Sequence, residues 1–135
     1  MNLFSMKKFL FCFLVVVFFN HKSDAQQIQI YNNYSYFPVD SNYKMTLVDI
    51  GTLRCAPCLK MQPVLDSVKK KYGTQVDVIF YNIGTKEGKE NAKQIAFGAI
   101  PVQVFFNREG KEIYRHEGFF SEQEIETFLL TRGVK

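Results

Sequence analysis

Apolar and polar residues follow two different periods along the chain from residue 45 onward, and each change of period marks a new element. From Met45 onward, Leu47, Val48 and Ile50 form a short apolar run that is closed by Gly51 and predicts a buried strand, with Asp49 as the one exception inside it. A helix is expected next, ending at Gly73 and kinked at Pro63. Its apolar residues fall on one face at helical spacing: Met61, Val64, Leu65, Val68 and Tyr72.

The next two elements are a strand and a helix. A mostly apolar run predicts a largely buried strand over residues 76–83. A helix is expected over 86–97, with Gly98 as its C-cap. The face of this helix that we expect to be buried holds Ala92, Ile95 and Ala96.

The C-terminal part of the chain predicts a hairpin followed by a helix. Strands over 102–106 and 112–116 flank a short loop ending at Gly110, where a positive φ is expected. Ser121 and Glu124 form a capping box for the last helix. The buried face of that helix is formed by Ile125, Phe128 and Leu129. The whole order of elements predicts an α/β fold, with a central mixed β-sheet flanked by helices on both faces.

The first 25 residues have the pattern of a cleaved secretory signal peptide. Lys7 and Lys8 precede an apolar run over 9–19, and the small residue Ala25 ends a suitable cleavage site. This run is shorter than the roughly 20 apolar residues that span a bilayer comfortably. We therefore expect an exported, periplasmic or extracytoplasmic protein. The alternative is an uncleaved anchor, which would be the chain's one association with the membrane.

Cleavage after Ala25 leaves a chain long enough for one small domain. We expect residues 26–44 to be a lead-in segment with one short strand near 28–31, and residues 45–135 to form the domain, as a monomer. The formal net charge of +4 falls to +2 once Lys7, Lys8, Lys22 and Asp24 are removed. This balance gives no basic stripe for nucleic acid. The lysine run at 69–71 is expected to be a solvated helix end.

Two cysteines remain after the loss of the signal, which carries Cys12, and they form one C-x-x-C motif. A disulfide between Cys55 and Cys58 closes too small a loop to stabilise the fold much. Cys55 is expected at the start of a helix, where backbone N–H groups stabilise a thiolate, and Pro57 suits the first helical turn. Cys58 is expected to be shielded and to attack a mixed disulfide. Arg54 either adds positive charge beside Cys55 or points into water.

Other uses of the cysteine pair fit the sequence less well. Covalent haem attachment requires a histidine directly after the second cysteine, and this residue is Leu59. Structural zinc requires four ligands, whereas His116 is the one further soft ligand of the mature chain. No metal or cofactor is therefore expected. We expect His116 to be a surface residue and not a catalytic base.

Residues 45–131 resemble the thioredoxin superfamily, in particular its small exported members. The resemblance lies in LVDIG, CAPC, Pro63 and GAIPVQVFF. It implies a thioredoxin fold with a cis Ile100–Pro101 bond that faces Cys55 and pairs with an extended substrate chain. From the residues alone, Pro101 would be an ordinary proline at the start of a strand. The substrate-binding residues that we expect are Arg54, Ala56, Pro57, Ile100 and Pro101.

The resemblance also implies that Asp49 is a buried acid that exchanges a proton with Cys58. Burial raises the pKa of a carboxyl toward the range useful for proton transfer. The alternative is an acid that turns to solvent at the strand end. The sequence departs from the family at three positions: Arg54 replaces the usual tryptophan, Ala56 the commoner glycine, and Phe80 a lysine that many cytosolic members bury near the acid.

Three functions are compatible with these residues. In the first, the protein is a thiol–disulfide oxidoreductase that reduces disulfides of other proteins and is recharged by a membrane thiol donor. In the second, the same chemistry runs in reverse, as a disulfide oxidase or isomerase, with the direction set by the reduction potential. In the third, the protein is a non-catalytic module that binds a peptide or Cu(I) through soft thiolates.

Overall fold

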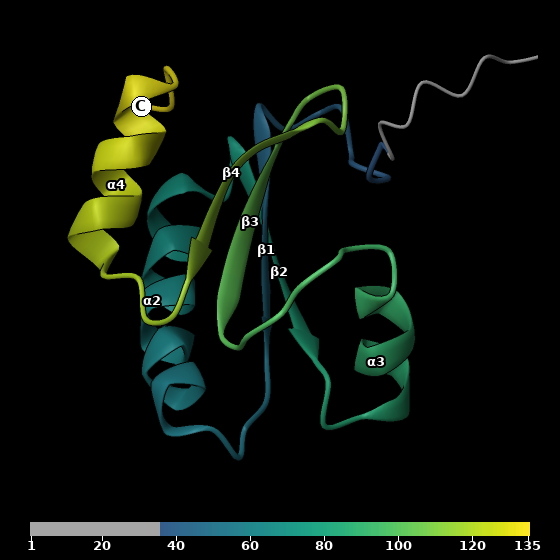
Figure 1. The fold of residues 1–135 in the computed structure, drawn as a ribbon. Coiled ribbons are helices and arrows are strands. Elements are labelled where there is room, and N and C mark those ends of the chain that lie inside the picture. The colour runs from purple at the N-terminus through teal and green to yellow at the C-terminus, as the bar shows by residue number, and fades with distance from the viewer. Residues whose placement is uncertain (1–35) are drawn as a thin grey trace, which may run out of the picture. The chain divides into compact units, whose positions relative to one another are not determined.

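The computed structural model describes residues 36–135, which lie in one compact unit. The elements of this unit follow the order expected from the sequence (Figure 1). They are β1 (Met45–Gly51), α2 (Ala56–Tyr72), β2 (Val76–Asn82), α3 (Lys86–Ala92), β3 (Val102–Asn107), β4 (Glu112–Glu117) and α4 (Glu122–Thr131). The expected signal peptide and the short strand near residues 28–31 lie outside the described residues.

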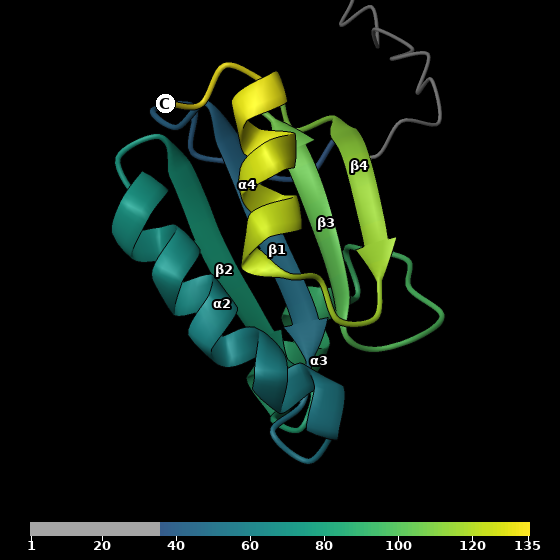
Figure 2. The ribbon, with the colours of Figure 1, turned by 90° about the vertical axis from the view of Figure 1, so that its left-hand side faces the viewer.

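The four strands form one mixed sheet in the order β2-β1-β3-β4. β1 pairs in parallel with β2 and antiparallel with β3, and β3 pairs antiparallel with β4. Helices α2 and α4 cover one face of the sheet and α3 covers the other (Figures 1 and 2). The prediction of a mixed sheet with helices on both faces is therefore confirmed.

β1 separates two apolar cores because successive side chains of a strand point to opposite faces of the sheet. Leu47 packs under α2 and α4, whereas its neighbour Val48 packs on the α3 side. The larger core also receives Met61 and Leu65 from α2 and Phe105 from β3. All seven residues of β1 are buried, so the strand that leads to the cysteines is held rigidly from both sides.

The segment before β1 is part of the domain's packing. Phe37 is buried, and its ring stacks on Phe106 with ring centroids 4.4 Å apart. The backbone N–H of Phe37 donates to the carbonyl of Gly110 in the hairpin turn. Gly110 has a φ of 78°, as the hairpin prediction requires, and a Cβ at this position would lie 2.2 Å from the Phe37 carbonyl oxygen.

Helix α3 is shorter than the sequence suggests. It ends at Ala92 and not at residue 97, so Gly98 is not its C-cap. The backbone tightens there, because the N–H of Ile95 donates to the carbonyl of Ala92, three residues earlier. This turn buries Ile95 and leaves Ala96 exposed, which corrects the expected buried face. The Arg115 guanidinium of β4 binds the Ala96 carbonyl and holds the segment that follows the helix.

Strand β2 is less buried than its apolar run suggests. Within the described residues it is an edge strand of the sheet, and among its seven residues Val76 alone is fully buried. Apolar residues on both faces of a strand indicate that helices cover both faces of the sheet. They do not indicate whether the strand lies at the centre or at the edge of the sheet.

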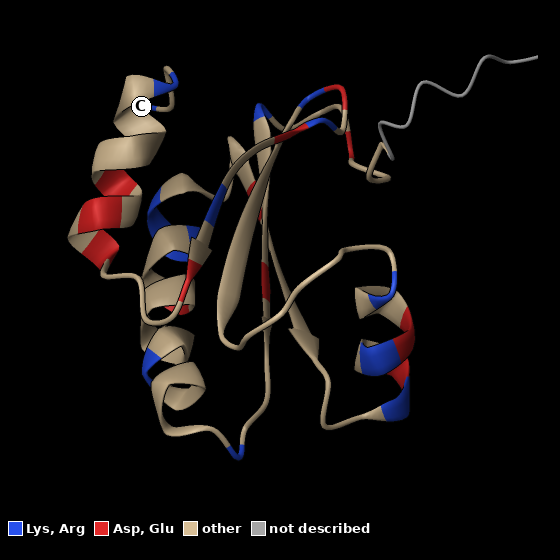
Figure 3. Cartoon of the chain, in the orientation of Figure 1, with Lys and Arg blue, Asp and Glu red and all other residues tan. Residues whose placement is uncertain are grey.

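The two helices on the same face of the sheet are joined by charged residues. Lys71 of α2 lies 2.5 Å from Glu122 and 2.7 Å from Glu126 of α4. The hydrogen bonds to Glu122 and then Glu126 hold the pKa of Lys71 above its ordinary value. The lysine run at 69–71 is therefore only partly a solvated helix end, since its last member crosses to α4. Charged residues elsewhere lie mainly on the outer helices and the hairpin (Figure 3).

Candidate active site

The cysteine pair lies where β1 passes into α2, and the two cysteines are joined by a disulfide with Cα atoms 5.2 Å apart. Cys55 is the N-cap of α2, and its Sγ accepts a hydrogen bond from the backbone N–H of Cys58 at 3.3 Å. Cys58 is fully buried, whereas Cys55 is partly exposed. This asymmetry suits one sulfur to meet a substrate and the other to act from behind it.

Gly51 brings β1 close against the buried cysteine. A Cβ at this position would lie 3.2 Å from Cβ and 3.3 Å from Sγ of Cys58, and 3.4 Å from the ring of Phe80. These distances are at the short limit of ordinary contacts, so a side chain here would displace its neighbours. The sequence marked Gly51 only as the end of a strand. The structure shows its further role, because the absence of a side chain at Gly51 lets β1 approach Cys58 closely.

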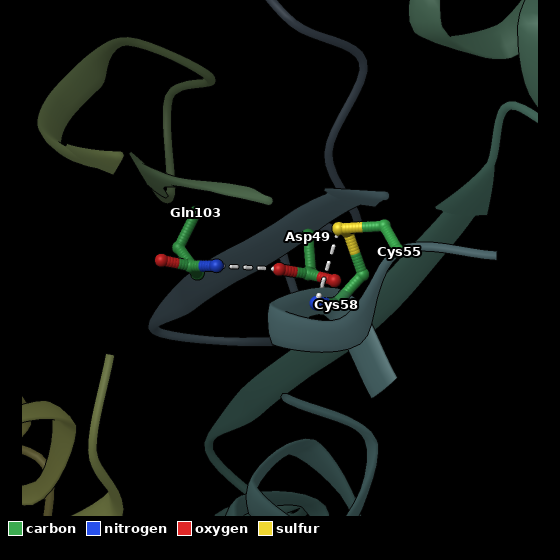
Figure 4. The surroundings of a disulfide bond; sticks show 4 residues. All are labelled: Asp49, Cys55, Cys58 and Gln103. Atoms are coloured by element: carbon green, nitrogen blue, oxygen red, sulfur yellow. Dashed lines mark hydrogen bonds between the residues drawn. A yellow bond between two sulfur atoms is a disulfide. The ribbon is translucent and has the colours of Figure 1, made fainter. Parts of the chain in front are cut away.

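Asp49 lies on β1 two residues before Gly51 and on the same face of the sheet. It is fully buried, so the alternative of an acid turned to solvent does not hold. Its Oδ1 accepts a hydrogen bond of 2.7 Å from Nε2 of Gln103, which is its partner on β3 and is also fully buried. Figure 4 shows the carboxyl between Gln103 on one side and the two cysteines on the other.

The environment of Asp49 favours its neutral form. Burial raises the pKa of this carboxyl from its ordinary value of 3.8 to about 6, although the Gln103 hydrogen bond acts in the opposite direction. A carboxyl with this pKa can both accept and release a proton near neutral pH. Phe80 of β2 is the other cross-strand partner of Asp49, so one neighbour of the acid is apolar, as the sequence comparison with the family predicted.

Sequence reasoning missed Gln103. It stands in an alternating strand with apolar residues on both sides, and a glutamine there gives no local signal of its role. One clue was available, because an amide at a core-facing position of a strand requires a buried partner. The antiparallel register between β1 and β3 was needed to show that this partner is Asp49.

The Ile100–Pro101 peptide bond is cis, as the resemblance implies. Pro101 is buried and its carbonyl accepts from the N–H of Gly118. Ile50, at the end of β1, pairs with Val102, so the start of β3 lies at the same edge of the sheet as the turn into Cys55. Within residues 36–135 the backbone N–H and C=O of Ile100 make no hydrogen bond.

The remaining residues expected at the site are at the surface. Arg54, Ala56 and Pro57 are exposed, and Pro57 lies in the first turn of α2 as expected. His116 is partly exposed and stacks on Phe120, with ring centroids 4.1 Å apart. It is the β4 partner of Gln103, which places it on the far side of Gln103 from Asp49.

Across residues 36–135, no three His, Cys, Asp or Glu side chains are grouped so that they could hold a metal ion. No helix in the same part of the chain is long and apolar enough to cross a membrane.

Together the fold and the cysteine pair define a thioredoxin-fold protein with a dithiol–disulfide centre at a strand-to-helix turn. The family profile of the thioredoxin-like domain matches residues 39–132. The chain therefore belongs to the thioredoxin superfamily, and it is a thiol–disulfide oxidoreductase in the general sense.

Individual relatives agree with this assignment. The thioredoxin of Borreliella burgdorferi is 25% identical over 83 residues, which covers 62% of this chain and 68% of that protein. The chloroplastic M-type thioredoxin of Pisum sativum is 28% identical over 109 residues, covering 76% of this chain and 62% of that protein. The germline-specific thioredoxin Deadhead of Drosophila melanogaster has the same fold, with a TM-score of 0.57 at 19% identity over 67% of this chain and 83% of that one.

Proposed function

We propose that this protein reduces disulfide bonds of other proteins outside the cytoplasm through the Cys55/Cys58 dithiol. The observation that carries the proposal is the asymmetry of the pair, in which a partly exposed sulfur caps a helix and a fully buried sulfur lies one turn behind it. A partly exposed sulfur that accepts a hydrogen bond from the Cys58 N–H at the start of a helix is suited to attack as a thiolate.

The reaction has two steps in this proposal. In the first, the Cys55 thiolate attacks a substrate disulfide, a mixed disulfide forms, and one substrate sulfur leaves as a thiolate. In the second, the Cys58 thiol loses its proton to Asp49, attacks Sγ of Cys55, and releases the second substrate sulfur. Two electrons pass from the dithiol to the substrate, and the protein is left with the Cys55–Cys58 disulfide.

The substrate segment is expected to pair with the backbone of Ile100. The N–H and C=O of this residue have no partner within residues 36–135, and the residue lies at the same end of the sheet as the turn into Cys55. An extended peptide that used both groups would be held by main-chain hydrogen bonds, which carry no sequence preference. Exposed Arg54, Ala56 and Pro57 would then contact its side chains.

The reductase activity is tested with insulin as the disulfide substrate and dithiothreitol as the electron source. We expect the wild-type protein to accelerate insulin reduction well above dithiothreitol alone, and Cys55→Ser to abolish this acceleration. Cys58→Ser should trap the substrate as a stable mixed disulfide, because the resolving sulfur is missing. A wild-type protein that adds nothing to the dithiothreitol rate, and a Cys58→Ser variant that traps nothing, would favour the non-catalytic binding module.

The direction of the reaction is tested by equilibrium titration against glutathione. A reductase requires a potential well below that of the glutathione couple, whereas a potential well above it would favour a disulfide oxidase or isomerase. The partly buried Ile100 would serve either direction, so the titration and not the geometry separates the two.

Export is proposed from the first 25 residues. The full chain, expressed in a bacterial host with two membranes, is expected in the periplasm with its N-terminus directly after Ala25, as read by mass spectrometry. A full-length product in the membrane fraction would favour the uncleaved anchor.

An extracytoplasmic reductase also needs a source of electrons, for which we propose a membrane thiol donor. We further propose that the mature protein is a monomer, which sedimentation analysis would test.

A further inference from the structure

A polar pair occupies the centre of the sheet on the face covered by α2 and α4. Asp49 and Gln103 are Cα partners between β1 and β3, and both are fully buried. The next pair on the same face is Leu47 with Phe105, which belongs to the apolar core. An apolar residue at position 103 would continue this core without burying an amide, so packing alone does not account for the glutamine.

The pair is incompletely satisfied, which argues against a role in stability. Within residues 36–135, Oδ2 of Asp49 and Oε1 of Gln103 are both buried without a hydrogen-bond partner. Each such atom loses its hydrogen bonds to water on folding and gains none in return. A buried polar network that is only partly satisfied weakens a fold, so stability does not explain this pair and a functional role does.

The unpaired Oδ2 of Asp49 is placed where it can exchange a proton with Cys58. Gln103 binds Oδ1 and thereby leaves Oδ2 as the reactive atom of the carboxyl. Gly51 is the next residue on the same face, about 7 Å along the strand, and a Cβ there would touch Sγ of Cys58 at 3.3 Å. Asp49 lies between Gln103 and the cysteines (Figure 4).

We propose that Gln103 is the positioning residue of Asp49: it holds Oδ1 so that Oδ2 faces Cys58, and its donated hydrogen bond keeps the buried carboxyl able to act as a base. The inference rests on the proposed function, in which Asp49 takes the proton of Cys58 before this sulfur attacks Cys55. The proton then passes from Asp49 to the substrate thiolate that leaves. Gln103 exchanges no proton in this step.

The other titratable groups around the pair come from three elements. The cysteines lie at the start of α2, and His116 of β4 is the cross-strand partner of Gln103. Glu124 of α4 interacts electrostatically with His116 and not with Asp49. β2 contributes only the ring of Phe80 at this level of the sheet. Gln103 is therefore the one hydrogen-bond donor to the acid among the described residues.

The proposal is tested with Gln103→Met, which keeps the length of the side chain and removes the donor. The first readout is the titration of the Asp49 carboxyl carbon by NMR in the disulfide form. The pKa of about 6 is expected to rise in the variant. The second is stopped-flow kinetics of the reduced protein with a disulfide reporter, which separates attack by Cys55 from the later attack by Cys58.

The pH profile of the second step should shift, and that of the first should not. If the midpoint rises by about one pH unit, the Cys58 step slows about fivefold at pH 6 and is unchanged at pH 9, because the carboxylate fraction is restored there. The matched control is Thr46→Val, which removes another buried polar group from β1 on the opposite face. This control should change neither the NMR titration of Asp49 nor the pH profile of the Cys58 step.

Two results would overturn the proposal: an Asp49 titration that coincides in the wild type and Gln103→Met, or a variant that slows both steps equally at every pH. Gln103→Glu is the second variant if the methionine does not fold. Two carboxyls that share a proton should displace the midpoint upward even further. Should the wild type reduce no disulfide at any pH, the proposed function fails, and the NMR titration still decides whether Gln103 controls Asp49.

Discussion

Asp49 should make the stability of the folded protein depend strongly on pH. Its pKa is raised from 3.8 to about 6 by burial, so the folded protein holds this proton more tightly than the unfolded chain does. Below pH 3.8 both states are protonated and there is no penalty. Between pH 3.8 and pH 6 the unfolded chain loses this proton while the folded state still holds it, so the free energy of unfolding falls across this window and levels off once the pH has passed 6. The difference in pKa corresponds to about 3 kcal/mol.

The substitution Asp49→Asn isolates this effect. Asparagine has almost the same shape, can accept the same hydrogen bond from Gln103, and does not ionise. Urea unfolding of both disulfide-bonded proteins between pH 4 and pH 8 gives the free energy of unfolding of each. Between pH 4 and pH 8 we expect the free energy of unfolding of the variant to rise relative to that of the wild type by about 2.4 kcal/mol, since the titrations of all other groups cancel in the difference.

Thr46→Val is the control for this series. It changes a buried polar group of the same strand without altering a titratable group, so its effect on the free energy of unfolding should be the same at pH 4 and pH 8. A difference between wild type and Asp49→Asn that stays within about 1 kcal/mol across the range would refute the reasoning, because it would show that burial does not perturb this carboxyl.

Three further predictions concern packing and caps. Gly51→Ala should destabilise the protein by about 1–3 kcal/mol in urea unfolding, because the added methyl group would crowd Cys58. Gly98→Ala is the control, because Gly98 is exposed with open space around it, and it should leave the free energy of unfolding almost unchanged. Phe37→Ala should cost about 3 kcal/mol by the same assay if the segment before β1 belongs to the core. Ser121→Ala should cost about 1 kcal/mol through the lost cap of α4, and a thermal midpoint equal to that of the wild type would contradict this.

Most of the fold was predictable because each element has its own local signal. The helical spacing that begins at Met61 and the capping box at Ser121 led to α2 and α4. The glycine expected at positive φ in the hairpin is Gly110. The end of α3 was not predictable from spacing, because Ile95 reaches the core through a tighter turn and not through another turn of α-helix.

The site was predictable only where its residues lie close together in the sequence. Cys55 and Cys58 form a C-x-x-C motif, which is typical of a redox-active dithiol. The resemblance to the family predicted the cis bond before Pro101. Gln103 lies 54 residues from Asp49, and only the pairing of β1 with β3 brings the two side chains together. The local pattern of residues can show that a buried amide needs a partner, but the partner's identity depends on the strand register, which the pattern does not contain.

The sulfur of Cys55 has two structural roles. It belongs to the partly exposed cysteine of the disulfide, and it also caps α2 by accepting a hydrogen bond from the N–H of Cys58. Any chemical event at this sulfur, whether reduction, alkylation or capture by a substrate, therefore alters the first turn of the helix. Hydrogen exchange at the Cys58 amide should differ between the disulfide, the thiolate and an alkylated form, and so offers a backbone reporter of the redox state in the intact protein.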